Sequence, residues 1–213
     1  MDLENYLIAK GNKTMLVRGC PTGDQLLFAK KSLQEAEQVG FVSNETHLFL
    51  TMMGGELCID AMMALAWSLK IPEGYFHASG VTEEVHFTNI DGSTSITLTL
   101  PYERIGSVIL FEGIGYLCTE TSAAYSKQEI EALSDKYQLP AFGIINYVDT
   151  TIRPTIYVKK TNSLVQESAC GSGSIAVHLI TGGQDIIQPS GGVINVSHTG
   201  STFTVGAVVT QVG

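Results

Sequence analysis

The chain has 213 residues, 44% of them apolar, and its 12 Lys and Arg against 21 Asp and Glu give a net charge of −9. This length allows one large domain or two small ones with a sizeable core. The acidic balance argues against nucleic acid, and no apolar run approaches the roughly 18 residues of a membrane span. Because the acidic start does not resemble a signal peptide, we expect a soluble, cytoplasmic protein.

Apolar spacing and turn residues predict mixed secondary structure in the first half. The predicted elements are strands at 6–9 and 14–17, a helix near 24–37, a strand at 47–52, a helix from Cys58 to Leu69, and a hairpin over 85–100. The hairpin rests on an Asp-Gly pair between two alternating runs.

The second half repeats this order. Its predicted elements are strands at 108–111, 142–147, 155–158, 193–197 and 203–209, a helix at 126–137, and a helix from Cys170 to Ile180. Ser126 and Glu129 have the spacing of a capping box at the start of the first of these helices.

Two offsets suggest an internal duplication. Cys170 follows Cys58 by 112 positions, and two Ser-Gly pairs, at 79–80 and 190–191, are 111 apart. We therefore predict two halves related by a pseudo-twofold axis, 1–100 with Cys58 and 101–213 with Cys170. In this division the last strand can still pair with strands of the first half.

Each of these two cysteines stands where a helix is predicted to begin. The unpaired N–H groups and the positive end of the helix dipole should lower the pKa of such a thiol and hold a carboxylate. If the halves face each other, two thiols flank one cleft, which suits removal of a proton from one face of a carbon and its return to the other. The alternative for each cysteine is a small buried apolar residue.

Other cysteine chemistries fit less well. A phosphatase loop needs Arg six residues after the cysteine, where this chain has Ala64 and Ala176. The glycines after Cys170 lack the Lys of a phosphate loop, and no metal-ligand spacing is present. His178 lies too far along the same helix to serve Cys170 as a base.

The segment Glu-Ser-Ala-Cys-Gly-Ser-Gly at 167–173 resembles the C-terminal cysteine motif of the diaminopimelate epimerase superfamily, the cofactor-independent amino-acid racemases and epimerases. The pair at 11–12 resembles the family's substrate loop, and 190–192 its late turn. The segments 37–41 and 153–170 and the Gly-x-Glu-x-Cys around Cys58 are closer to the histidine racemases of staphylopine-type metallophore biosynthesis.

This resemblance implies an α+β fold of two pseudo-symmetric domains, each a mostly antiparallel sheet rolled around a central helix, with the site in the cleft between them. It implies a racemase that inverts the α-carbon by two-thiol proton transfer, with histidine the first candidate substrate. The expected partner is a small-molecule amino-acid substrate, and no cofactor, metal, nucleic acid or membrane is expected. A homodimer is one of the assemblies that the resemblance allows.

The implied roles can be carried over residue by residue. Cys58 and Cys170 would be the acid/base thiols, Glu167 would bind the α-ammonium, the N–H groups of Gly171 and Ser172 would cradle the carboxylate, Asn12 would contact the substrate, and Glu37 would face its side-chain end. The alternatives without a role in the site are a turn residue for Asn12, an exposed residue at a helix end for Glu37 and a solvated carboxylate for Glu167.

One departure from the family stands at the first cysteine, where Cys58-Ile59-Asp60 replaces the usual Cys-Gly-Asn. Asp60 would meet the substrate with a negative charge where its carboxylate is held. The chain also lacks the Arg after Glu167, which argues against meso-diaminopimelate. The alternatives are a binding protein that has lost turnover, and an isomerase of the phenazine-biosynthesis type, which relies on a carboxylate base and lacks the thiol pair.

Overall fold

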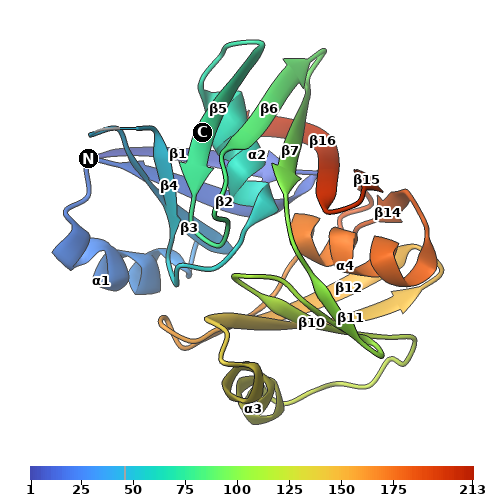
Figure 1. Ribbon diagram of the computed structural model, residues 1–213. Helices are drawn as coiled ribbons and strands as arrows, with labels where there is room; N and C mark the ends of the chain where they lie inside the picture. The colour runs from blue at the N-terminus through green and yellow to red at the C-terminus, as the bar shows by residue number, and fades with distance from the viewer. Residues whose placement is uncertain (46) are drawn as a thin grey trace.

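The computed structural model describes residues 1–45 and 47–213, and its strands surround two buried helices (Figure 1). The elements of the first half are β1 (Asp2–Ile8), β2 (Gly11–Arg18), α1 (Thr22–Ser32), β3 (Gln38–Ser43), β4 (Phe49–Met52), α2 (Ile59–Ser68), β5 (Glu73–Ala78), β6 (Val85–Ile90) and β7 (Ser93–Thr99). Those of the second half are β8 (Glu103–Ile105), β9 (Val108–Leu110), β10 (Gly115–Thr119), α3 (Lys127–Tyr137), β11 (Ala141–Val148), β12 (Thr151–Val158), β13 (Ser163–Gln166), α4 (Gly171–Thr181), β14 (Asp185–Ile187), β15 (Val193–Thr199) and β16 (Thr202–Val212).

The pairing of the strands repeats between the halves. β2 is parallel to β3, β3 antiparallel to β4, β4 parallel to β5, and β5, β6 and β7 continue antiparallel. The same series runs through β10, β11, β12, β14, β15 and β16. A helix follows the first and the third strand of each series. The order and direction of the strand pairings therefore recur in the second half, and the division into two domains stays a prediction.

The two helices after the cysteines lie inside the strands. α2 contacts strands of the first half and β16, and α4 contacts β10, β11, β12, β14, β15 and β16 (Figure 1). The residues 59–66 of α2 and 171–178 of α4 are all buried. A helix that is apolar on all sides is stable only in such an interior position. β16 pairs with β7, β15 and β1 and so belongs to the surroundings of both helices.

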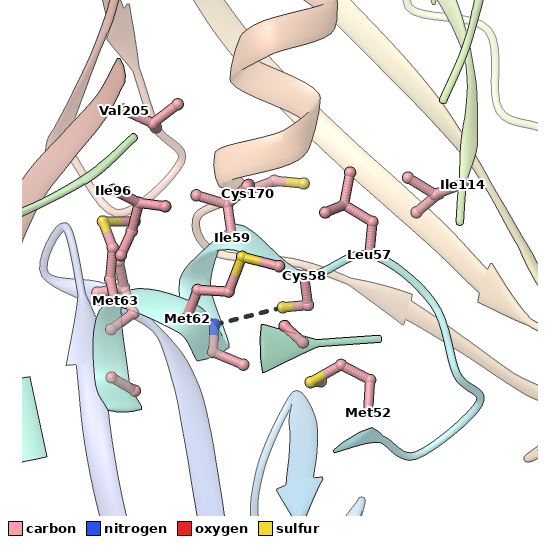
Figure 2. Close-up of a cluster of buried hydrophobic side chains, with 14 of the residues drawn as sticks. Met52, Leu57, Cys58, Ile59, Met62, Met63, Ile96, Ile114, Cys170 and Val205 are labelled. Atoms are coloured by element: carbon pink, nitrogen blue, oxygen red, sulfur yellow. Dashed lines mark hydrogen bonds between the residues drawn. The ribbon is translucent and has the colours of Figure 1, made fainter. Parts of the chain in front are cut away.

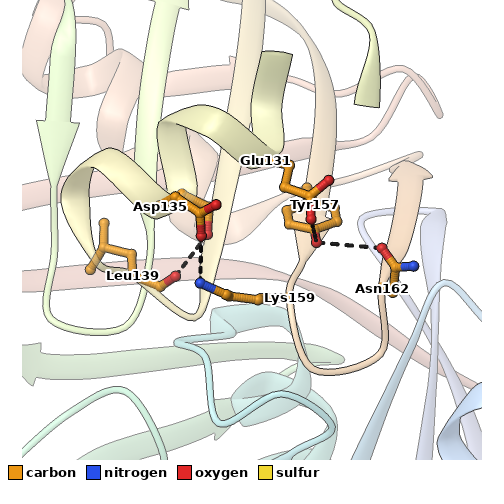
Figure 3. Close-up of polar contacts among 7 residues, drawn as sticks. Glu131, Asp135, Leu139, Tyr157, Lys159 and Asn162 are labelled. Atoms are coloured by element: carbon orange, nitrogen blue, oxygen red, sulfur yellow. Dashed lines mark hydrogen bonds and ion pairs between the residues drawn. The ribbon is translucent and has the colours of Figure 1, made fainter. Parts of the chain in front are cut away.

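α3, by contrast, packs on the outside of β11 and β12. Its capping box of Ser126 and Glu129 is present as predicted. Figure 3 shows how its exposed side is tied to the end of β12: Tyr157 Oη donates to Glu131 Oε1 at 3.0 Å, and Lys159 pairs with Asp135.

The α+β class and most predicted elements are confirmed, but the helix predicted near 24–37 is wrong in its last third. α1 ends at Ser32, and the Glu37 N–H donates to Lys13 O of β2, which starts an extended segment instead. Sequence reading missed the strands β3, β5, β8, β10, β13 and β14. Within residues 1–45 and 47–213, no helix is long and apolar enough to cross a membrane.

Candidate active site

Both cysteines cap the buried helices, as the sequence predicted. Cys58 is the N-cap of α2, and its Sγ accepts the Ala61 N–H at 3.4 Å. Cys170 is the N-cap of α4, and its Sγ accepts the Gly173 N–H at 3.3 Å. Each sulfur therefore satisfies one of the N–H groups that a helix start leaves unpaired.

The two helix starts lie against each other. A Cβ placed on Gly171 would come within 2.8 Å of Ile59 Cβ, so the lack of a side chain on α4 allows the approach. Figure 2 shows Cys58 and Cys170 on either side of Ile59, each at the beginning of its helix. Two thiols from opposite halves of the chain thus gather in one buried region.

Asp60 bridges the two starts. Its Oδ2 accepts the Gly171 N–H at 2.7 Å, while its Oδ1 is buried and has no hydrogen-bond partner among the described residues. The N–H group that was expected to hold a substrate carboxylate is therefore bonded to a carboxyl group of the chain itself. The Oγ of Ser172 shares a 2.6 Å hydrogen bond with Tyr116 Oη, and the role expected for the Ser172 N–H stays a prediction.

A small cavity lies at this junction. It has a volume of about 20 Å³, enough for about one water molecule. Cys58 and Tyr116 line it, and the Sγ of Cys170 lies behind, 3.8 Å from Tyr116 Oη. The four acidic residues that line it are Glu37, Glu56, Asp60 and Glu167, and none of its described lining residues is Lys, Arg or His.

This acidic, buried setting changes the protonation of the thiols. Burial raises the pKa of both Cys58 and Cys170 well above its ordinary value, and the carboxyl groups of Asp60 and Glu167 raise it further. The prediction that a helix start gives each of these thiols a lowered pKa is therefore wrong. The N–H groups at the helix starts do lower the pKa, but desolvation of the charged form outweighs them.

Three carboxyl groups in the same cavity also hold their protons more tightly. Burial raises the pKa of Asp60 and of Glu56 to about 7, against the N–H donors of Gly171 and Gly54. Burial and then the charge of Asp60 raise the pKa of Glu167 well above its ordinary value.

Asn12 is buried and connects the N-terminal turn to the second cysteine. Its backbone N–H donates to Ser168 Oγ and its Nδ2 to Ala169 O, both at 2.6 Å. Its Oδ1 accepts from Gln38 Nε2, and Gln38 Oε1 in turn accepts the thiol proton of Cys58 at 2.7 Å. Asn12 therefore links both cysteine segments, and Gln38 is a site residue that sequence analysis missed.

Glu37 is held by the segment before Cys170. The N–H of Ser168 donates to Glu37 Oε2 at 2.8 Å, and its hydroxyl donates to Oε1. Glu37 lines the cavity, but it lies between strands and not at a helix end as the alternative had it.

Glu167 stands at the boundary of the cavity. The residue lines both the small cavity and an open groove of about 730 Å³, while its Oε2 is buried without a partner among the described residues. This position suits a group that meets a ligand on its way into the site.

Tyr116 and Gln188 were also missed. Gln188 Oε1 accepts the Cys170 N–H at 2.9 Å, from the turn after β14. Neither residue stands in a motif of local sequence: Tyr116 lies on β10 and Gln188 in the turn after β14. Within the described part of the chain, no group of three His, Cys, Asp or Glu side chains has a metal-binding arrangement.

In sequence, the chain is similar to a histidine racemase of Fusobacterium nucleatum. The two are 28% identical over an alignment that covers 78% of this chain and 76% of the relative. No protein-family model matches the chain.

In structure, the chain is similar to a predicted epimerase from Pseudomonas aeruginosa, with a TM-score of 0.67 and 10% identity over 99% of this chain and 96% of that one. It is also similar to a phenazine biosynthesis protein of the PhzF family from Enterococcus faecalis, with a TM-score of 0.61 and 13% identity over 100% and 98%. These likenesses establish a shared fold.

Proposed function

Because the chain resembles the diaminopimelate epimerase-like superfamily in sequence and shares its fold, we propose that it is an isomerase of this type. In its sharper form, the proposal is a cofactor-independent racemase or epimerase that inverts the α-carbon of an amino acid. Histidine is the first candidate substrate, since the similar curated protein is named a histidine racemase.

The observation that carries the proposal is the meeting of two cysteine-capped helix starts. Cys58 and Cys170 come from opposite halves of the chain and lie on either side of Ile59 (Figure 2). Inversion of a carbon needs a proton acceptor on one face and a donor on the other, and general acid–base groups of this kind contribute about 10²–10⁴-fold each.

The substrate must change the protonation of the site. One thiol has to lose its proton to solvent before it can accept the α-proton, whereas the acidic surroundings hold both thiols neutral. An α-ammonium group beside Glu167 would add the positive charge that the cavity lacks and lower the pKa of the nearby thiol. Substrate binding would in this way activate the base.

Access to the thiols requires movement, because a cavity of about 20 Å³ does not hold an amino acid. In the proposal the two helix starts move apart to admit the substrate from the groove at Glu167, while β16 stays paired with β7 and β1. The Asp60 contact with Gly171 crosses between the two helix starts, so it would open as the substrate enters and re-form once the substrate is bound.

A second candidate is an isomerase with a carboxylate base, of the kind expected for phenazine biosynthesis proteins. The fold shared with a PhzF-family protein and the four acidic residues of the cavity favour it. In that reaction the thiols would be dispensable, so cysteine variants separate the two candidates.

The test is a screen of L-amino acids with the protein in deuterated buffer, with mass gain at the α-carbon as readout. Incorporation that is lost in both Cys58→Ala and Cys170→Ala supports the two-thiol racemase. Incorporation that survives in the double variant favours a carboxylate base. Binding of an amino acid without any exchange contradicts an isomerase acting at the α-carbon and leaves a binding protein.

A further inference from the structure

Asp60 is the residue of this cavity whose two carboxyl oxygens have contrasting environments. Oδ2 is anchored by the Gly171 N–H at 2.7 Å, whereas Oδ1 is buried and unpartnered among the described residues. Asp60 is 1% exposed and lines the cavity. A buried charged oxygen without a donor is costly, so either a proton or a ligand must satisfy it.

The surroundings decide between a charged and a neutral carboxyl group. The titratable groups that face this region are Glu37 before β3, Glu56 and Cys58 before α2, Tyr116 of β10, and Glu167 and Cys170 before α4. None of them supplies a positive charge. Burial accordingly raises the pKa of Asp60 to about 7 despite the Gly171 N–H, so that a large fraction is protonated at neutral pH.

The second helix start shows what such a proton could do. Ser172 stands 112 positions after Asp60, as Cys170 does after Cys58, and it also lines the cavity with a hydroxyl group. A protonated Asp60 carries its hydroxyl on Oδ1, the oxygen that the Gly171 N–H leaves free. Each start then carries a hydroxyl group at the corresponding position, and that of Ser172 is hydrogen-bonded to Tyr116 Oη.

We propose that Asp60 serves as a neutral carboxylic acid whose Oδ1–H donates a hydrogen bond to the carboxylate of the bound amino acid. This inference rests on the proposed racemase function. The proton stays on Asp60 throughout, while the α-proton moves between substrate and thiols. When the α-proton leaves, charge builds up on the substrate carboxylate, and a donor placed there stabilises it. Protein sites can keep a carboxyl group neutral for this purpose.

Binding of L-histidine as a function of pH, measured by calorimetry, tests this role. Because L-histidine itself titrates, the readout is the ratio of affinities between variants. Asp60→Asn keeps a donor at every pH, so its advantage over the wild type should grow by up to about tenfold per pH unit above pH 7. Asp60→Leu has no donor and should bind about 10- to 100-fold more weakly than Asp60→Asn at all pH values. A ratio that does not change with pH, or equal binding by Asp60→Leu, overturns the proposal.

Glu56→Gln is the matched control. Glu56 is a buried carboxyl group of the same cavity with a pKa raised by burial to about 7, but one of its oxygens is bonded to the Gly54 N–H of its own loop. It should keep the wild-type pH dependence. If Glu56→Gln abolishes that dependence and Asp60→Asn does not, the donor has been assigned to the wrong residue.

Infrared spectroscopy gives a readout that needs neither turnover nor binding. The wild-type spectrum minus the Asp60→Asn spectrum should contain a protonated carboxyl band at pH 6, because the protonated Glu56 and Glu167 contribute to both spectra and cancel. Absence of this difference band overturns the neutral acid even if racemisation is observed. A protein that shows the band and the pH-dependent binding but no α-exchange refutes the proposed racemase and leaves the donor role of Asp60 in binding.

Discussion

The helix starts at Cys58 and Cys170 have the same architecture and different chemistry. Both cysteines cap a buried helix, and both sulfurs accept the N–H three residues on. The residues that follow differ, however, with Ile59 and Asp60 at the first start and Gly171 and Ser172 at the second. The backbone arrangement that holds the thiols is the same at both starts, while the side chains next to them differ.

This difference makes the pair complementary. Ile59 occupies the space that Gly171 leaves open, and Asp60 occupies the N–H that Gly171 offers. Two identical starts with Ile at this position could not approach each other so closely. The lesson is that a pseudo-twofold site need not be chemically symmetric, and that its asymmetry can be read from two pairs of residues 112 positions apart.

Removal of either thiol is expected to have the largest effect. Cys58→Ala and Cys170→Ala should each lower the rate of racemisation by about 10²–10⁴-fold, because the thiol on one face of the substrate cannot transfer a proton on the opposite face. Enantiomer analysis of the product measures this. Cys20→Ala, which alters a cysteine on the outside of the fold before α1, should behave as the wild type. Full activity in either site variant would refute the two-thiol mechanism.

The start of α2, which carries Asp60, should also limit the stability of the folded protein at high pH. The pKa of Asp60 is raised from 3.8 to about 7, so the folded protein binds this proton more tightly than the unfolded chain. The stabilisation is complete below about pH 4 and is lost as pH rises to about 7, a change on the order of 4 kcal/mol. Unfolding in urea should therefore show that the wild type loses more free energy of unfolding between pH 5 and pH 8 than Asp60→Asn does.

The exposed turn carboxyl of Asp149 provides the control for that comparison, and Asp149→Asn should follow the wild type at both pH values. If Asp60→Asn and the wild type lose stability equally between pH 5 and pH 8, then Asp60 is not the protonated group that the burial indicates.

Gly171→Ala tests the close contact of the two starts. The added Cβ would lie 2.8 Å from Ile59 Cβ, and such overpacking costs about 1–3 kcal/mol. Thermal unfolding should show a lower Tm. Gly23→Ala in α1, where a Cβ meets nothing within 4 Å, should not lower the Tm. A Gly171→Ala protein as stable as the wild type would mean that the helices can separate freely.

The smallest effect concerns thiol reactivity. Because burial raises the pKa of Cys58 and Cys170, alkylation with iodoacetamide at pH 7 should modify the partly exposed Cys20 first. Peptide mapping after short exposure measures the order. Preferential labelling of Cys58 or Cys170 in a sample without added amino acid would show that the helix N–H groups outweigh desolvation.

Sequence patterns predicted what depends on local order. Cysteine at a helix start, the capping box of Ser126, and the repeat of the elements all follow from spacing along the chain, and all are present. The end of α1 was mispredicted because pairing of β3 with β2 overrides the helical spacing around Leu33 and Ala36.

The rest of the site depends on contacts between distant segments. The Gln38 bond to Cys58 and the Tyr116 bond to Ser172 join residues 20 and 56 positions apart, and no local pattern marks them. The thiol pKa was mispredicted for a related reason. A helix start lowers it by a local effect, whereas the burial and the carboxyl groups that raise it come from the packing of the two halves.

The most direct test of the central claim follows the isotope at the α-carbon early in the reaction of the wild type with L-histidine in deuterated buffer. With one thiol on each face, the D-isomer should carry deuterium from its first appearance, while the remaining L-isomer stays protiated. Deuterium entering the L-isomer as fast as the D-isomer, or a D-isomer formed without deuterium, would contradict inversion by two facing thiols.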